Sequence, residues 1–266
     1  MRTLLIILTF LFCYNNSNAQ SVVDSLKTEF HLSEATLLAK DIKLSATWYR
    51  RYLNLDIKEY KPQKIVKLKT GAFLLSIKQG RNIIIRSQVR LPNGKKYING
   101  INKIGFACNQ FTSLYEALIS NDQKIVEEIS FDKNIAMRFF VTQDPDGNSI
   151  QIFDQPNKVE KLTCSAILFS IISSDYINTM RWYEENIDFT AVEVIDDTKI
   201  HFQNLLHKGE VLFEIIHLPY ESLETTEFMP LGRELTGFEQ LTFKSQLGKN
   251  STFRMDNNAN RIIWLR

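Results

Sequence analysis

The chain has 266 residues, and its 32 lysines and arginines nearly balance its 30 aspartates and glutamates, which leaves a formal net charge of +2. A balance this close to neutral provides no electrostatic footprint for nucleic acid or for an anionic membrane surface. Hydrophobic residues make up 44%, charged residues 23%, and glycine and proline only 10 and 6 residues, which is typical of a folded globular protein and excludes disordered and low-complexity classes.

The first 19 residues have the pattern of an export signal. Arg2 is followed by a mainly apolar run over 3–12, and Ser17 and Ala19 place small side chains at the −3 and −1 positions of a cleavage site. A run this short does not span a bilayer, which takes roughly 20 residues. We therefore predict a signal peptide over 1–19 and an exported protein, periplasmic or secreted, without a transmembrane segment in the mature chain. An N-terminal anchor or a buried helix is the alternative.

Cleavage would leave two cysteines, Cys108 and Cys164, and a net charge of 31 − 30 = +1. In an exported protein, two cysteines can form one disulfide. Both cysteines lie within apolar runs that resemble strands, which is typical of buried thiols. We favour two buried free thiols, with a disulfide as the alternative. Two cysteines and four scattered histidines do not match a zinc finger or a Cys-x-x-Cys motif.

Two segments that lie 134 residues apart share one pattern. Segments 41–55 and 175–189 both begin with Asp, carry Trp-Tyr at the eighth and ninth positions, and end on an apolar residue. Apolar residues spaced by four and three predict one buried helix face, and the initial Asp can cap the free N–H groups at the helix start. Strands are expected before and after these helices, over 35–39, 65–68 and 73–77 in the first copy and over 166–172, 199–202 and 211–216 in the second.

A further copy of the pattern lies between these two. It predicts a strand over 104–108, a helix over 111–119, and strands over 125–131, 136–142 and 149–153. The last two strands are joined by Asp144–Asn148, which reads Asp-Pro-Asp-Gly-Asn. This sequence predicts a tight turn, because Pro fixes φ, Asp can bond its own backbone and Gly accepts a positive φ.

The Trp-Tyr helix after a short strand, together with the DPDGN-x-I-x-I motif, resembles the vicinal oxygen chelate superfamily, which includes glyoxalase I, bleomycin-resistance proteins and extradiol dioxygenases. The resemblance covers 33–154 well and 162–265 weakly. It implies an α+β fold in which paired βαβββ modules form half-barrel sheets. It also implies two tandem glyoxalase-like domains, over 20–155 and over 158–266, of which the second is degenerate.

In this superfamily a divalent metal is often held by His, Glu or Gln side chains of the strands. Carried over by position, the resemblance assigns the ligand-binding slots of the first domain to Glu34, Ser76, Lys103 and Gln151. Glu34 and Gln151 would hold a metal if one is bound. A protonated lysine has no lone pair and opposes a divalent cation, so we expect no cofactor, with a divalent metal as the open alternative.

Lys103 has a second interpretation, because it could form an ion pair with Glu34 across the same site. Solvated surface side chains are the alternative for both residues. Gln151 interrupts an apolar strand on the face opposite Ile150 and Ile152, which predicts that it faces the ligand side of the sheet.

The second half of the chain is poorer in ligand types, since its corresponding slots are Leu168, Glu214, Gln240 and Ile263. Its last module is also short. The interval from Lys103 to Gln151 is 151 − 103 = 48 residues, but that from Gln240 to Ile263 is only 263 − 240 = 23. We therefore predict a truncated module without a helix, made of three strands near 238–244, 252–255 and 261–265.

No nucleophile elbow, phosphate-binding glycine loop or His-Glu-x-x-His motif occurs in the chain. We therefore expect an exported protein that binds a small molecule in the half-barrel of the first domain, without classical metal catalysis and with no catalytic residue assigned. One alternative is a metal-dependent lyase or dioxygenase-like enzyme that uses an atypical Glu/Gln ligand set. A structural or interaction role with a filled pocket is the other.

Overall fold

The structure is a computed structural model, and it describes residues 30–80, 88–90, 96–98, 101–133, 135–156, 160–173, 176–198, 201–217, 237–245, 251–255 and 261–265. The predicted signal peptide over 1–19 lies outside the described residues. The chain is α+β and repeats one unit, in which a strand and a helix are followed by further strands.

The repeated unit is complete three times. The first module contains β1 (Phe30–Ala39), α2 (Ile42–Leu53), β2 (Asp56–Lys61), β3 (Ile65–Thr70) and β4 (Phe73–Gln79). The second contains β7 (Ile101–Cys108), α3 (Phe111–Ser120), β8 (Ile125–Asp132), β9 (Met137–Gln143) and β10 (Ser149–Asp154). The third contains β11 (Cys164–Ser173), α4 (Tyr176–Ile187), β12 (Thr190–Thr198), β13 (His201–Lys208) and β14 (Val211–His217). A small hairpin of β5 (Gln88–Arg90) and β6 (Lys96–Ile98) lies between the first two modules.

The last module is truncated, as predicted. Its elements are β15 (Gly237–Ser245), β16 (Ser251–Met255) and β17 (Arg261–Leu265), and its described residues contain no helix. The three strands match the predicted ranges to within one residue at each end.

The modules pair in an order that the sequence interpretation did not anticipate. The first and last modules form a seven-stranded sheet, β16-β17-β15-β1-β4-β3-β2, and the second and third form an eight-stranded sheet, β12-β13-β14-β11-β7-β10-β9-β8. Each sheet therefore draws strands from both of the predicted domains, and the half-barrel expected from the first two modules alone does not form. The cause is long-range antiparallel pairing of β1 with β15 and of β7 with β11.

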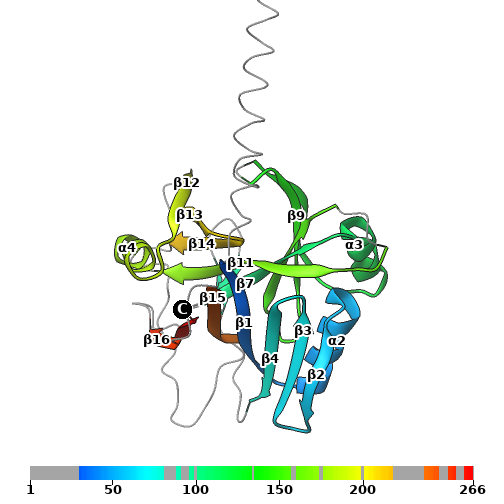
Figure 1. Cartoon of the computed structure of the whole chain (residues 1–266). Helices are drawn as coiled ribbons and strands as arrows, with labels where there is room; N and C mark the ends of the chain where they lie inside the picture. Colours follow the sequence, from blue (N-terminus) through cyan, green and yellow to red (C-terminus); the bar gives the residue numbers. More distant parts are fainter. Residues whose placement is uncertain are drawn as a thin grey trace, which may run out of the picture.

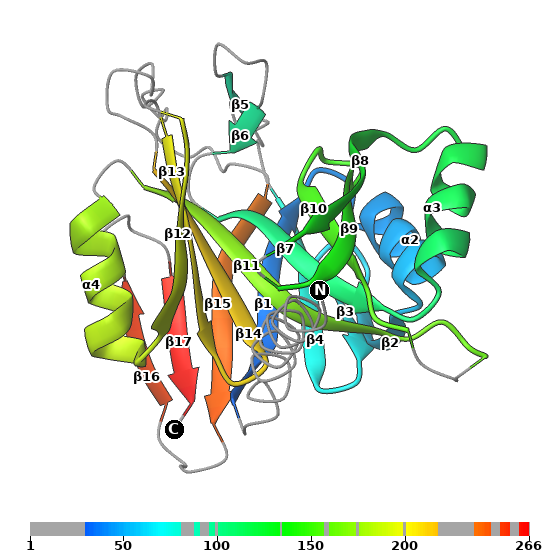
Figure 2. The same ribbon diagram turned by 90° about the horizontal axis from the view of Figure 1, so that it is seen from above.

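Figure 1 shows the curl of the eight-stranded sheet, in which β12 and β13 rise on one side, β9 rises on the other, and β7 and β11 lie between them. The helices lie at the two ends of the molecule, with α2 beside α3 at one end and α4 at the other (Figure 2). One continuous hydrophobic core takes in the helices and one face of each sheet. Phe169 of β11 and Phe243 of β15 meet in this core, with ring centroids 5.0 Å apart.

Helix α2 forms as the repeat predicts. Asp41 is the N-cap, and its carboxylate accepts hydrogen bonds from the backbone N–H groups of Lys43 and Leu44 at 2.9 and 3.0 Å. Trp48 and Tyr49 lie on the buried face, at 4% and 0% exposure. The residue that would cap α4, Asp175, lies outside the described residues.

The turn Asp144–Asn148 also forms as predicted, and it fastens the second module to the first. The Tyr49 hydroxyl of α2 donates a hydrogen bond to the buried Asp144 carboxylate at 2.9 Å. Asp146 accepts hydrogen bonds from the Ser45 hydroxyl at 2.9 Å and the Lys40 backbone N–H at 3.0 Å. Burial raises the pKa of Asp144 to about 6, and burial together with the Asp144 charge raises the pKa of Tyr49 well above 10.

The expectation of two free thiols is wrong, because Cys108 and Cys164 form a disulfide. Both are buried, as predicted, at 0% and 2% exposure. They are direct cross-strand partners on β7 and β11, with their Cα atoms 4.2 Å apart. This pairing depends on the contact between the second and third modules, which no local sequence pattern records.

Candidate functional site

Four polar side chains share the face of the eight-stranded sheet that lies opposite the core. Lys103 of β7, Ser170 of β11 and Glu214 of β14 are cross-strand partners in one row. Gln151 of β10 is the partner of Gly105, two residues along β7 from Lys103. Because cross-strand partners, and residues two apart on a strand, point to the same side of a sheet, these side chains lie on one surface. We call these four residues, Lys103, Gln151, Ser170 and Glu214, the polar site.

The polar site contains a buried ion pair. Lys103 Nζ lies 3.0 Å from Glu214 Oε2, and the two side chains are only 14% and 4% exposed. Strand β11 separates β7 from β14, so the pair spans the intervening strand at Ser170. Removing one partner of a buried pair leaves an uncompensated charge and costs about 3 to 5 kcal/mol. Lys103 and Glu214 therefore stabilise the joint between the second and third modules.

Two buried polar atoms beside this ion pair lack a partner. Gln151 Oε1 and Ser170 Oγ are buried, and neither makes a hydrogen bond to any residue that the structure describes. Leaving such an atom unsatisfied costs about 1 to 3 kcal/mol. The polar site therefore has unused capacity for hydrogen bonds with a molecule that lies against it.

The rest of this face is apolar. Gly105 separates the polar residues from this part, and a Cβ atom added there would lie 2.7 Å from Leu168 Cβ and 2.8 Å from Phe153 Cε2. A buried cluster on this face consists of Ala107, Ile135, Phe153, Leu168, Leu205 and Leu212. His207 of β13 is the cross-strand partner of Leu212, and burial lowers its pKa, so its imidazole is neutral at pH 7.

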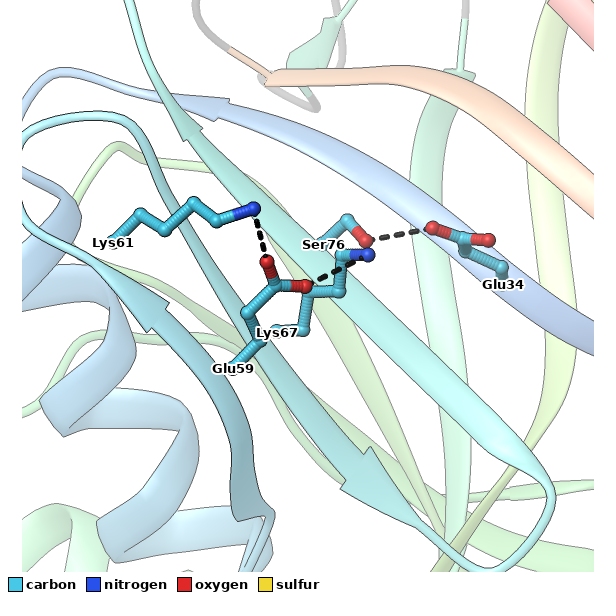
Figure 3. A network of polar contacts seen from close by, with 5 residues as sticks. All are labelled: Glu34, Glu59, Lys61, Lys67 and Ser76. Atoms are coloured by element: carbon cyan, nitrogen blue, oxygen red, sulfur yellow. Dashed lines mark hydrogen bonds and ion pairs between the residues drawn. The ribbon is translucent and has the colours of Figure 1, made fainter.

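The seven-stranded sheet carries a separate polar network, which Figure 3 shows. Ser76 Oγ of β4 donates a hydrogen bond to Glu34 Oε1 of β1 at 2.6 Å. Lys67 and Lys61 contact the Glu59 carboxylate at 2.9 and 2.6 Å. Hydrogen bonds from both lysines lower the pKa of Glu59, and Glu59 raises the pKa of Lys67. Lys61 and Lys67 are exposed enough for solvent to weaken these contacts.

The predicted site residues therefore fall into two groups. Glu34 and Ser76 meet on the seven-stranded sheet, whereas Lys103 and Gln151 share a face of the eight-stranded sheet. The expected ion pair between Glu34 and Lys103 is wrong, because Lys103 pairs with Glu214. The cause is again the joining of the second module to the third.

The sequence analysis missed Ser170. The residue interrupts the apolar run Ala166–Ile172, and a serine inside such a run was an available signal. Glu214 was recognised as a ligand-type residue, but it was assigned to a different site from Lys103. A cross-strand partner cannot be read from one sequence, so the row of Lys103, Ser170 and Glu214 needed the structure.

The residues present do not fit a divalent metal. Within the part of the chain that the structure describes, no three His, Cys, Asp or Glu side chains are grouped closely enough to hold one. At the polar site an ammonium already contacts the carboxylate, and Leu168 has no donor atom to offer. Glu34 and Gln151, the predicted metal ligands, lie on different sheets.

Comparison with known proteins identifies the class. Residues 31–152 match the Glyoxalase/Bleomycin resistance protein/Dioxygenase superfamily. Glyoxalase I from Zea mays has the same fold, with a TM-score of 0.61 at 12% identity over 89% of this chain and 92% of that one. A mutant of the Zea mays enzyme gives 0.62 at 13% identity over 93% and 96%. No curated protein sequence matches the chain significantly.

The resemblance predicted from the sequence is confirmed. This is a glyoxalase-fold protein whose paired βαβββ modules form half-barrel sheets, and its segment 31–152 belongs to the glyoxalase, bleomycin-resistance and dioxygenase superfamily. None of its described helices is long and apolar enough to cross a membrane.

Proposed function

We propose that the chain is an exported protein that binds a small molecule at the polar site, without metal catalysis. The observation that supports this most directly is the pair of buried atoms, Gln151 Oε1 and Ser170 Oγ, that lack hydrogen-bond partners among the described residues. A bound molecule that reaches both atoms removes the cost of leaving them unsatisfied. The leader pattern over 1–19 supports export.

The surface around the polar site fits a ligand with two unlike ends. Lys103 and Glu214 form an ion pair at one end, and the apolar cluster that includes Phe153 and Leu168 lies on the same face. Small-molecule sites generally combine an apolar lining with a few polar groups that fix orientation. A molecule with an apolar body and a hydrogen-bonding end therefore suits this face.

A thermal-shift screen of the purified mature protein tests the proposal. Its compounds should be small molecules with an apolar body and hydroxyl, amide or carbonyl groups. A compound that raises Tm should lose its effect in Gln151→Leu and Ser170→Ala. It should keep its effect in Ser76→Ala, a matched control on the other sheet. Hits that ignore Gln151→Leu and Ser170→Ala would refute binding at the polar site.

One observation favours a second candidate, a structural role in which this face is filled by the protein itself. Phe153, Leu168 and Leu212 are buried at 0%, 3% and 1% exposure. If the face is only core, Gln151→Leu should raise the free energy of unfolding, because it removes an unsatisfied polar atom. A stabilising Gln151→Leu together with an empty screen would favour this role.

A further inference from the structure

The family resemblance places ligand slots for a metal on four adjacent strands of the eight-stranded sheet. In this chain those slots hold Lys103, Gln151, Leu168 and Glu214, on β7, β10, β11 and β14. The slots do converge, because the first and last of these side chains touch at 3.0 Å. What differs is the chemistry, since one slot carries a permanent cation and another carries no donor atom.

We infer that the Lys103 ammonium is the resident cation of this site and takes the place that a divalent metal would occupy. The carboxylate that a metal would need, that of Glu214, is already neutralised by the ammonium. A divalent ion at this point would lie beside a buried positive charge, in surroundings that screen little. The remaining oxygen ligand, Gln151 Oε1, is too weak to hold the ion alone.

This assignment also limits the class of ligand. The ion pair of Lys103 and Glu214 has no net charge, so an anionic molecule gains little from it. Gln151 Oε1 is an acceptor without a partner among the described residues and needs an O–H or N–H group. The site therefore suits an uncharged molecule that donates a hydrogen bond, rather than a metal-bound anion.

The test removes the resident cation and adds a metal. Lys103→His takes away the ammonium, supplies a nitrogen lone pair, and leaves Gln151 and Glu214 as further ligands from neighbouring strands. Co²⁺ is titrated into the purified wild-type and variant proteins, with binding followed by calorimetry and by the visible absorption of the metal. We expect the variant to bind one Co²⁺ at least about a hundredfold more tightly than wild type. Its Tm should rise by about 5 °C or more with saturating Co²⁺.

Two controls locate the effect. Lys161→His places a histidine at an exposed lysine position and should gain no Co²⁺ site. Adding Glu214→Gln to Lys103→His should abolish the new site, because it removes the carboxylate. Lys103→Gln is the second variant if Lys103→His folds poorly, and both are also refolded with Co²⁺ present.

Saturable Co²⁺ binding to wild type that is lost in Glu214→Gln would overturn the inference. Failure of both Lys103→His and Lys103→Gln to gain Co²⁺ affinity, whether purified folded or refolded with the metal, would overturn it as well. The inference rests on the proposed site but not on its ligand. An empty ligand screen would therefore leave it standing, and a failed metal titration would leave the screen meaningful.

Discussion

The disulfide between Cys108 and Cys164 joins the central strands of the eight-stranded sheet, and with them the second and third modules. Its two residues lie 56 positions apart in the chain. For a loop of that length the lost entropy of the unfolded chain, 2.1 + 1.5R ln 56, is about 14 cal/mol/K, or about 4 kcal/mol at 25 °C. We expect reduction of the bond to lower the free energy of unfolding by about this amount.

Urea denaturation of the mature protein, with and without a thiol reductant, measures the effect. With a slope of about 3 kcal/mol per M for a chain of this size, the midpoint should fall by more than about 1 M on reduction. The double variant Cys108→Ala and Cys164→Ala is the control, because it has no bond to reduce. Its midpoint should not respond to the reductant.

Alkylation before reduction gives the decisive negative result. If both cysteines of the unreduced, denatured mature protein react with iodoacetamide, the thiols are free and the reasoning fails. Identical wild-type urea curves with and without the reductant, after reduction has been verified by mass, would refute the stability estimate alone.

Three further predictions concern other parts of the chain. Gly105→Ala should lower the free energy of unfolding by about 2 kcal/mol in urea, because the new Cβ would meet Leu168 and Phe153 at 2.7 and 2.8 Å; an unchanged midpoint would mean that this face is loosely packed. Asp144 has its pKa raised from 3.8 to about 6 by burial, so the folded state holds its proton more tightly than the unfolded state, and this group should cost stability as pH rises from about 4 to 6, by about 3 kcal/mol in all. Asp144→Asn should remove that part of the pH dependence, and an equal slope in wild type and variant would count against it. Mass spectrometry of the exported protein should find Gln20 as the first residue, and a mature form that begins at Met1 would contradict the leader.

Local features of the fold could be predicted because their causes are local. The spacing of apolar residues around Trp48 and the capping Asp41 depends on contacts within one helix turn. The turn at Asp144 depends on bonds to its own loop. The short last module could be predicted from length alone, since 246–250 is too short for a packed helix and its connections.

The rest depends on contacts between distant parts of the chain. Strands β2 and β12 were missed because they lie at sheet edges, and β2 carries exposed charged residues such as Lys58 instead of an apolar run. The pairing of modules could not be predicted because each apolar strand matches several partners equally well. The disulfide and the partner of Lys103 follow from that pairing, so both were assigned incorrectly.

The two assignments of Lys103 differ in a way that a double-mutant cycle can measure. If Lys103 pairs with Glu214, Lys103→Met should cost about 3 to 5 kcal/mol, because the carboxylate of Glu214 stays buried without its cation. Lys103→Met combined with Glu214→Met should cost much less than the sum of the two single variants, which gives a large coupling energy. The matched cycle uses Glu34→Met, since Glu34 bonds Ser76 on the other sheet, and there the costs should add to within about 0.5 kcal/mol. Urea denaturation of the six proteins supplies every value. Strong coupling of Lys103 to Glu34, with none to Glu214, would mean that the first module pairs with the second after all, and that the eight-stranded sheet is joined incorrectly at β7 and β11.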